Sequence, residues 1–433
     1  MFLQDIATGV ERPVYDGLDR DMQETWAIHG VYPGISWTPD NESVIAWAGG
    51  EIRGIDIRTG RATVIPFEVD DTRKVSKAVR FPVQVAPEQV EVKMLRWPRT
   101  HPVRSEIIYQ ALGYLYRKPL SGEPSRLTAQ TTSFEYYPSY SRDGGSVIYV
   151  EWNDEQLATI RIASSSGGAG RALTEEKGYY LEPTISPDGK LVVYRKSQGS
   201  GLTNPFYAKE PGIYVMPIDG GKPKLLSRSG SKPQFGASSE RVYFQDAEGE
   251  KAVLKSIGVD ATELRTHLLS EDTNDFRVSP DEKWVAFTEL YNAYIAPLVP
   301  TGKAVEISSK TKAIPVKRVS KDAGEYLEWS QDSRKLHWVL GPDYFTLELK
   351  DAFAFLPGAA EKLPETPATS QAIGFRAKAF VPTGTIAFTN VRIIPMIGET
   401  VIANGTIVVE GNRIKAIGEQ GKVSNSRAAA IIC

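Results

Sequence analysis

Short apolar runs, each preceded by a polar turn, recur along most of the chain. In the clearest copy, Pro183-Thr-Ile-Ser-Pro-Asp-Gly-Lys-Leu-Val-Val-Tyr194, a Ser-Pro-Asp-Gly turn leads into a strand that ends in an aromatic residue. Asp and Gly favour tight turns because Asp bonds its own backbone and Gly accepts a positive φ. The pattern therefore predicts a repeated strand–turn–strand unit. Further copies span 36–47, 138–149, 278–287 and 329–338, and degraded copies span 95–109 and 235–244.

A second block follows each of these units: a strand, a hairpin that contains Gly, and another strand. It is seen at 51–65, 113–127 and 212–225. The two blocks together give four strands in roughly 40 to 50 residues, which is the repeat length of a propeller blade. Runs such as Leu191–Tyr194 are apolar throughout, as expected for strands covered on both faces. We therefore predict an all-β protein, a β-propeller of about seven four-stranded blades. A β-sandwich is the alternative, and seven copies in one fixed order disfavour it.

The beginning of the chain matches only the second block. Residues 2–15 read as the outer strands of a blade whose inner strands are missing, so the first blade is expected to be incomplete. Two alternatives follow. These strands could complete the last blade and close a ring of seven, or upstream blades could have been lost.

The pattern divides the chain into four parts. We expect a propeller at 1–356 and a linker at 357–372, which is rich in Pro, Ala and polar residues. At 373–424 the β pattern returns, with hairpin dipeptides at Asn404-Gly405 and Gly411-Asn412. Roughly 50 residues of strand cannot bury a core of their own, so this part is expected to be half of a β-sandwich. Residues 425–433 are expected to be a frayed tail.

Composition and charge exclude several classes of protein. The 433 residues contain 51 Lys and Arg and 53 Asp and Glu, for a net charge of -2, which argues against a nucleic-acid-binding protein. No apolar run approaches the roughly 20 residues of a membrane-spanning helix. The one cysteine, Cys433, permits neither an internal disulfide nor a cysteine-based zinc site. No signal peptide is visible after Met1, but Met1 is not expected to be the natural start, so the compartment stays open.

Two resemblances to known families rest on these motifs. The Ser-Pro-Asp-Gly blades resemble TolB-type propellers. Residues 384–418, with Asn-Val-Arg-Ile and Asn-Gly-Thr-Ile-Val-Val-Glu-Gly-Asn-Arg-Ile-Lys-Ala-Ile-Gly, resemble the opening of an amidohydrolase-superfamily protein, where this stretch forms half of a composite β-sandwich beside a metal-dependent barrel. Residues 18–33 resemble a subgroup in which a TolB-like propeller precedes that barrel.

The second resemblance implies a parent protein that hydrolyses non-peptide C–N bonds with a divalent metal of the zinc type. Its members are usually exported, which implies a periplasmic or secreted parent. The chain ends before the His-x-His pair and the other metal ligands of that family. We therefore expect a fragment that carries no cofactor and no catalytic residue, whose first partner is the missing barrel. Whether the chain itself is an enzyme stays open.

The densest polar cluster is the candidate interaction site. It could form a docking patch on a propeller rim, whereas the simpler interpretation, which we favour, is a loop whose charges pair with one another and with solvent. Its members are Asp19, Arg20, Asp21, Glu24 and His29.

Other polar and aromatic residues are expected to be structural. His337 lies in an apolar strand, and His101 and His267 have no acidic or His neighbour at the spacing of metal ligands. The turn aspartates and most tryptophans occupy fixed places in the repeat, which favours structural roles. No Gly-x-Ser-x-Gly, Walker or His-Glu-x-x-His motif occurs.

Three hypotheses for function follow. The first is the propeller part of an amidohydrolase, itself catalytically incompetent. The second is a stand-alone propeller that binds a protein or peptide. The third and weakest is the cap of a prolyl-oligopeptidase-like enzyme, which would need an α/β-hydrolase domain that residues 373–424 do not begin.

Overall fold

The structure is a computed structural model that describes residues 1–18, 34–76, 78–79, 81–197, 209–366, 370–424 and 430–432. The chain forms two compact units, Met1–Val83 and Gln84–Cys433. Both are built from β-strands, as predicted, and the described residues include only a short 3-10 turn, η2 (Leu349–Asp351), besides them. Within the described part, no helix is long and apolar enough to cross a membrane.

The first unit contains two small sheets. The first pairs β1 (Phe2–Gln4) with β2 (Glu11–Pro13), and the second is the antiparallel sheet of β3 (Ser36–Trp37), β4 (Ser43–Ala48), β5 (Glu51–Asp56) and β6 (Ala62–Ile65). The four-stranded sheet has the order of a propeller blade, but Trp37 is 49% exposed and Trp47 is 39% exposed. Strands β1 and β2 pair with each other and not with the last sheet of the chain, so they do not complete it as one alternative expected.

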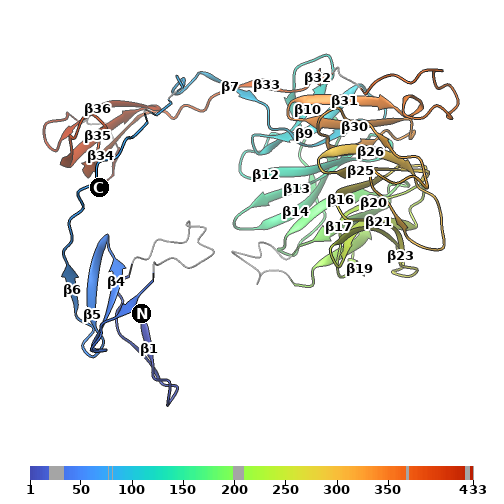
Figure 1. The fold of residues 1–433 in the computed structure, drawn as a ribbon. Helices are drawn as coiled ribbons and strands as arrows, with labels where there is room; N and C mark the ends of the chain where they lie inside the picture. Colours follow the sequence, from blue (N-terminus) through green and yellow to red (C-terminus); the bar gives the residue numbers. More distant parts are fainter. Residues whose placement is uncertain are drawn as a thin grey trace. The chain divides into compact units, whose positions relative to one another are not determined.

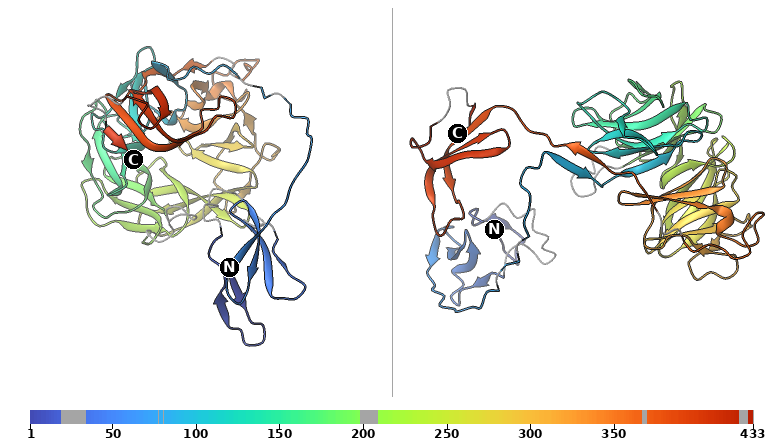
Figure 2. Two further views of the ribbon diagram at one scale, coloured as in Figure 1. Left: turned by 90° about the vertical axis from the view of Figure 1, so that its left-hand side faces the viewer. Right: turned by 90° about the horizontal axis from the view of Figure 1, so that it is seen from above.

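The second unit contains six successive sheets, coloured from teal to orange along the ring in Figure 1 and Figure 2. In each, the first strand is the inner strand and the chain proceeds outward. The first three sheets are β8 (Arg96–Thr100), β9 (Glu106–Ala111), β10 (Tyr114–Pro119) and β11 (Ser125–Arg126); β12 (Phe134–Tyr140), β13 (Ser146–Asn153), β14 (Leu157–Ser164) and β15 (Arg171–Ala172); and β16 (Tyr180–Ile185), β17 (Leu191–Lys196), β18 (Gly212–Pro217) and β19 (Lys224–Ser227).

The other three sheets follow the same plan. They are β20 (Ser231–Phe235), β21 (Arg241–Glu248), β22 (Lys251–Gly258) and β23 (Arg265–Ser270), extended by the parallel strand β27 (Val305–Glu306); β24 (Thr273–Val278), β25 (Trp284–Glu289), β26 (Asn292–Pro297) and β28 (Lys317–Arg318); and β29 (Glu325–Trp329), β30 (Lys335–Leu340), β31 (Asp343–Glu348) and β32 (Gln371–Ala372). Strand β32 lies within the stretch expected to be a linker, so the propeller continues beyond residue 356.

Six apolar clusters hold the sheets together, one between each pair of neighbours. Alternate residues of a strand face opposite neighbours: Tyr149 packs towards the first sheet, and Ile148 packs towards the third. The last cluster joins Ile107 and Tyr109 of β9 to Tyr344 of β31, and therefore closes the ring. The sequence predicted strands buried on both faces, and this alternation confirms it. Six sheets close the ring, whereas about seven blades were expected, because the sheet at residues 36–65 belongs to the other unit.

The repeated turn explains why the Ser-x-Asp motif recurs. In the copy at 186–191, Ser186 Oγ donates to Asp188 Oδ1 (2.6 Å), which also accepts the backbone N–H of Lys190 (3.1 Å). Ser186 Oγ in turn accepts the backbone N–H of Leu191 (2.9 Å). The pKa of Asp188 is lowered to about 2, first by the Ser186 hydroxyl, then by the hydroxyl of Ser239 and the backbone N–H of Lys190. The turn aspartates are therefore structural, as predicted.

Two segments leave the ring side by side. Strand β7 (Gln89–Val92) precedes the first sheet and pairs with β33 (Phe375–Lys378), which follows the last one. Beyond them lies one sheet, in which β34 (Thr385–Ile393), β35 (Ile402–Glu410) and β36 (Arg413–Glu419) are antiparallel and β37 (Ala430–Ile432) is parallel to β34. This single sheet occupies the region expected to be half of a sandwich. Strand β37 lies in the stretch expected to be a frayed tail.

Candidate functional site: the central channel

The five residues of the predicted interaction cluster, Asp19, Arg20, Asp21, Glu24 and His29, lie outside the described residues. The structure instead offers a channel at the centre of the ring, lined by all six inner strands. It consists of an outer compartment of about 470 Å³ and an inner compartment of about 130 Å³. Ligand pockets commonly have volumes of about 300–1,000 Å³, so the outer compartment can hold a ligand. Four residues line both compartments, and we call them the waist: Arg99, Ser139, Thr184 and Arg277.

A bulge in each inner strand shapes the outer compartment. All six pairs of inner and second strands show a register shift there. A bulge bends its strand and can re-aim a side chain. Five of the bulges hold a non-glycine residue at positive φ, between 49° and 56°, and each of these residues lines the outer compartment. They are Trp97, Tyr137, Glu182, Lys232 and Tyr326.

Aromatic rings occupy one side of the outer compartment. The Trp97 and Tyr137 rings, from neighbouring sheets, lie with centroids 4.2 Å apart. Burial, reinforced by the Glu182 carboxylate, raises the pKa of Tyr137 to about 12, so this phenol stays neutral at physiological pH. Tyr326 lines the same compartment, and its pKa is also raised by burial. These rings offer flat apolar surfaces with hydroxyl groups at their edges.

Charged groups cross the deeper part of the outer compartment. Asp275 Oδ1 lies 3.1 Å from Lys232 Nζ and 3.3 Å from Arg277 Nε. Burial alone would raise the pKa of Asp275, but the two cations together hold it below its usual range. Glu182 forms an ion pair with Arg195, with Oε2 of the carboxylate 3.1 Å from Nε of the guanidinium. It also accepts the backbone N–H of Lys232 (2.7 Å), which fixes that bulge.

Arg99 and Glu328 lie where the first and last sheets meet. Glu328 Oε2 accepts the backbone N–H of Thr100 (2.7 Å), and burial raises the pKa of this carboxyl. Burial lowers the pKa of Arg99, although an arginine remains charged in proteins. Thr100 Oγ1 is also 2.8 Å from the hydroxyl of Tyr344, which lies 2.7 Å from His337 Nδ1. A polar network therefore spans the junction that closes the ring.

Arg142 narrows one end of the channel, the end where the repeated turns lie. This residue follows the inner strand of the second sheet, and its side chain extends to the fourth sheet. Its Nη2 donates to the carbonyl of Gly236 (2.8 Å) and its Nη1 to that of Ala237 (3.4 Å), both after β20. Arg142 lines the inner compartment, so its side chain narrows this end.

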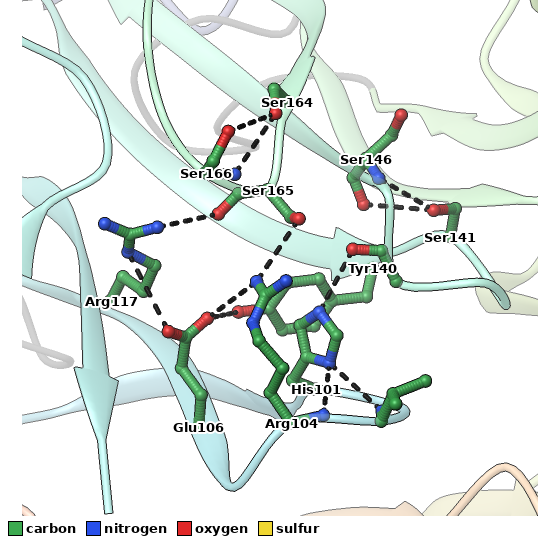
Figure 3. Close-up of polar contacts among 12 residues, drawn as sticks. His101, Arg104, Glu106, Arg117, Tyr140, Ser141, Ser146, Ser164, Ser165 and Ser166 are labelled. Carbon is green, nitrogen blue, oxygen red and sulfur yellow. Dashed lines mark hydrogen bonds and ion pairs between the residues drawn. The ribbon is translucent and has the colours of Figure 1, made fainter.

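His101 is buried beside the channel and plays a structural role. Its Nδ1 accepts the backbone N–H groups of Val103 (3.0 Å) and Arg104 (2.8 Å), so Nε2 carries the proton that is donated to the carbonyl of Gly144 (3.0 Å), as Figure 3 shows. Burial, followed by the Arg104 charge, lowers the pKa of His101. All ring nitrogens are in use, so this residue offers no position for a metal or for proton transfer.

Glu106 completes the polar cluster of Figure 3. Its Oε1 accepts from Arg104 Nη2 (3.0 Å) and from the Tyr140 hydroxyl (3.4 Å), and its Oε2 lies 3.9 Å from Arg117 Nε. Arg117 also donates to the backbone carbonyl of Ser165 (3.3 Å). These bonds join the first sheet to the second, and the cluster stabilises a junction between sheets.

The remaining histidines also have structural partners. His267 Nε2 lies 2.7 Å from Ser256 Oγ, and His337 Nδ1 lies 2.9 Å from Thr346 Oγ1. Among the residues that the structure describes, no group of three or more His, Cys, Asp or Glu side chains could hold a metal ion.

The sequence interpretation missed the channel residues, although a signal was present. In four inner strands the bulge residue is followed by proline: Trp97-Pro98, Tyr137-Pro138, Glu182-Pro183 and Lys232-Pro233. Proline is confined to bulges and edges within sheets because it cannot donate to the ladder. The residue before each proline could therefore have been assigned to a bulge that faces the channel.

Comparisons with known proteins agree with the propeller. No family model matches the chain. It is 26% identical over 151 residues to the uncharacterized peptidase YuxL of Bacillus subtilis, covering 35% of this chain and 21% of that protein. It is 29% identical over 79 residues to the Tol-Pal system protein TolB of Francisella tularensis, covering 18% of this chain and 16% of TolB. The chain thus spans about a fifth or less of the length of these relatives.

Among solved structures, the chain is similar to the putative TolB from Agrobacterium tumefaciens. The match has a TM-score of 0.41 and 19% identity and covers 47% of this chain and 76% of that protein. Part of the chain is therefore similar in sequence to TolB, and the repeated turns predicted a resemblance to TolB-type propellers. The resemblance of residues 384–418 to amidohydrolases stays an expectation.

Proposed function

We propose that the propeller is a binding module whose central channel holds an extended segment of a protein or peptide. One observation carries the proposal: all six inner strands contribute to a cavity of about 470 Å³ that combines aromatic faces with charged groups. An extended peptide presents both side chains and unpaired backbone groups, and this lining offers partners for both. The similarity of part of the chain to TolB supports a binding role.

A channel-blocking variant tests this proposal. Ser139 lies at the waist, where Ser139→Phe would fill space that a ligand needs. We expect short synthetic peptides from a library anchored through either end to bind the natural chain saturably, and to lose about tenfold or more in affinity with Ser139→Phe. Thr301→Phe, at an exposed loop position outside the channel, is the matched control. Binding that survives Ser139→Phe, or no saturable binding at all, would contradict the proposal.

A second candidate is that the chain belongs to a metal-dependent hydrolase of C–N bonds. The supporting observation is an apolar face on the sheet after the propeller. Its two cross-strand rows are Ile386, Val409 and Ile414, and Phe388, Ile407 and Ile417. Ile414 is 68% exposed in the described structure. A face of this kind in a sheet normally packs against a second layer.

This second candidate has its own test. The gene should continue beyond the codons of this chain into a segment with a His-x-His pair. The 433-residue chain should bind no stoichiometric zinc in equilibrium dialysis, because the metal ligands are expected in that segment. Stoichiometric zinc together with amidase activity in this chain would show that the assignment of the ligands is wrong.

A further inference from the structure

We propose that the channel recognises a carboxylate of its peptide ligand, bound at the waist by Arg99 and Arg277, and that this carboxylate is the ligand's C-terminus. The inference rests on the proposed function and adds the chemical group that the channel selects. Three observations carry it: an arginine with few partners, a waist that holds two cations and no carboxylate, and a channel that narrows at one end.

Arg99 has unused hydrogen-bonding capacity. A guanidinium carries five N–H donors in a planar fork that matches a carboxylate. Among the described residues the one hydrogen bond of this side chain is to the carbonyl of the preceding Pro98 (3.2 Å), and it forms no ion pair. Arg99 nevertheless lines both compartments of the channel. The side chain is half-buried, and the nearby Glu328 carboxylate favours its charge without forming an ion pair with it, so the fork keeps donors for the carboxylate of a ligand.

The waist itself carries positive charge. Of the four residues that line both compartments, two are arginines, Arg99 and Arg277, and none is a carboxylate. Asp275 lines only the outer compartment, where it is shared between Lys232 and Arg277, and Glu328 lines only the inner one. Elsewhere in the lining, Glu182 pairs with Arg195, Glu325 is exposed at the outer compartment, and Arg142 donates to carbonyl groups at the far end. A ligand carboxylate is therefore attracted to the waist more strongly than to the rest of the lining.

The shape of the channel favours the end of a chain over its middle. The outer compartment is more than three times the volume of the inner one, and Arg142 crosses the narrow end. A peptide that enters through the outer compartment finds less free volume beyond the waist, which favours placing its end there. The Trp97 and Tyr137 rings would then pack against the residues that precede the terminus. A side-chain carboxylate could reach the waist only if the backbone turned back within the compartment.

The test compares three forms of one set of short peptides, immobilised through their N-termini or labelled there for fluorescence anisotropy. The first form ends in a free carboxylate, the second in an amide, and the third in an amide with Asp or Glu placed near the end. We expect the free acid to bind, the amide to bind at least about tenfold more weakly, and internal Asp or Glu not to restore affinity.

Variants assign the effect to the waist. Arg99→Gln should abolish the difference between free acid and amide, and Arg99→Lys should retain part of it because the charge remains without the fork. Arg334→Gln, an exposed arginine outside the channel, is the matched control and should change neither affinity. Circular dichroism melting of each variant shows whether it is folded. If Arg99→Gln does not fold, the comparison of Arg99→Lys with the natural chain decides.

Each remaining outcome overturns the inference in a distinguishable way. Equal binding of free acid and amide, blocked by Ser139→Phe, would keep the channel as the peptide site and refute the carboxylate. Rescue of the amide by internal Asp or Glu would assign the carboxylate to a side chain instead of the terminus. If none of the three forms binds, the proposed function fails together with the inference.

Discussion

At the scale of the residue, the channel is built from backbone conformations that most side chains avoid. A non-glycine residue in the left-handed region costs on the order of 1 kcal/mol, and five inner strands hold one there. The strand pairs on either side of each bulge impose this conformation. In a regular strand, successive side chains point to opposite faces of the sheet. The bulges change this direction locally, and Trp97, Glu182 and Lys232 line the cavity.

His337 makes the stability of the propeller dependent on pH. Burial lowers its pKa to about 4, whereas an unfolded histidine titrates near 6.5. The unfolded state therefore binds the extra proton first, so stability is full above pH 6.5 and falls as the pH drops towards 4. We expect a loss of about 3 kcal/mol from this residue over that range.

Urea unfolding at several pH values measures this effect. The His337→Gln variant should lose less stability between pH 6.5 and 4 than the natural chain, because the amide can still accept from Tyr344 but does not titrate. Above pH 7 the two stability curves should run parallel, which serves as the internal control. Parallel curves down to pH 4 would show that His337 does not contribute.

At the scale of the element, the sheet after the propeller has two unlike faces. One face is buried and carries Ala387 (0% exposed), Thr406 (2%) and Val408 (3%). The other carries the apolar rows that contain Ile386 (38%), Ile414 (68%) and Ile417 (39%). Alternation along a strand produces such a division, and an exposed apolar face of this kind marks an interaction surface.

Substitutions on the two faces should have opposite consequences. Ile414→Lys should leave thermal stability unchanged within about 0.5 kcal/mol and reduce the binding of a hydrophobic dye, because the side chain is already exposed. Val408→Lys, on the buried face of the neighbouring strand, should destabilise the sheet by about 3 kcal/mol or more. Dye fluorescence and melting curves follow both effects. A large loss of stability from Ile414→Lys would mean that its face is covered.

At the scale of the whole molecule, the ring closes without the first unit. The sixth apolar cluster joins β9 to β30 and β31, so residues 96–372 form a complete ring of six sheets. The segment that follows β6 at the end of the first unit is exposed over most of its described length. Phe67 is 58% exposed, Val75 is 89% exposed and Phe81 is 78% exposed.

Limited proteolysis should separate the two units. Chymotrypsin is expected to cut first at Phe67, because the described part of this segment buries little side chain and carries no strand from 66 to 88, whereas the bond after Phe81 is protected by Pro82. A large fragment that contains the ring should then resist further digestion and keep its β-type circular dichroism and cooperative melting. Mass spectrometry identifies the fragments. Simultaneous degradation of the ring and the first unit would show that the ring needs residues 1–66.

The sequence by itself determined the repeat and its local structure. Ser186 and Asp188 form their turn through bonds within six residues, and the apolar run at 191–194 requires cover on both faces; both properties are local. The sequence did not determine how many sheets close the ring, because closure depends on whether residues far apart, such as Tyr109 and Tyr344, meet. One hint was present: the step between the aromatic residues at 47 and 109 is the longest in the series.

Tertiary structure alone decided the candidate site. Arg99, Lys232 and Arg277 belong to three different sheets, and no spacing along the chain brings them together. Their convergence follows from ring closure, which directs every inner strand towards one axis. The folded ring also sets the electrostatic environment of these cations, because their burial and their proximity to Asp275 and Glu328 exist only in the folded ring.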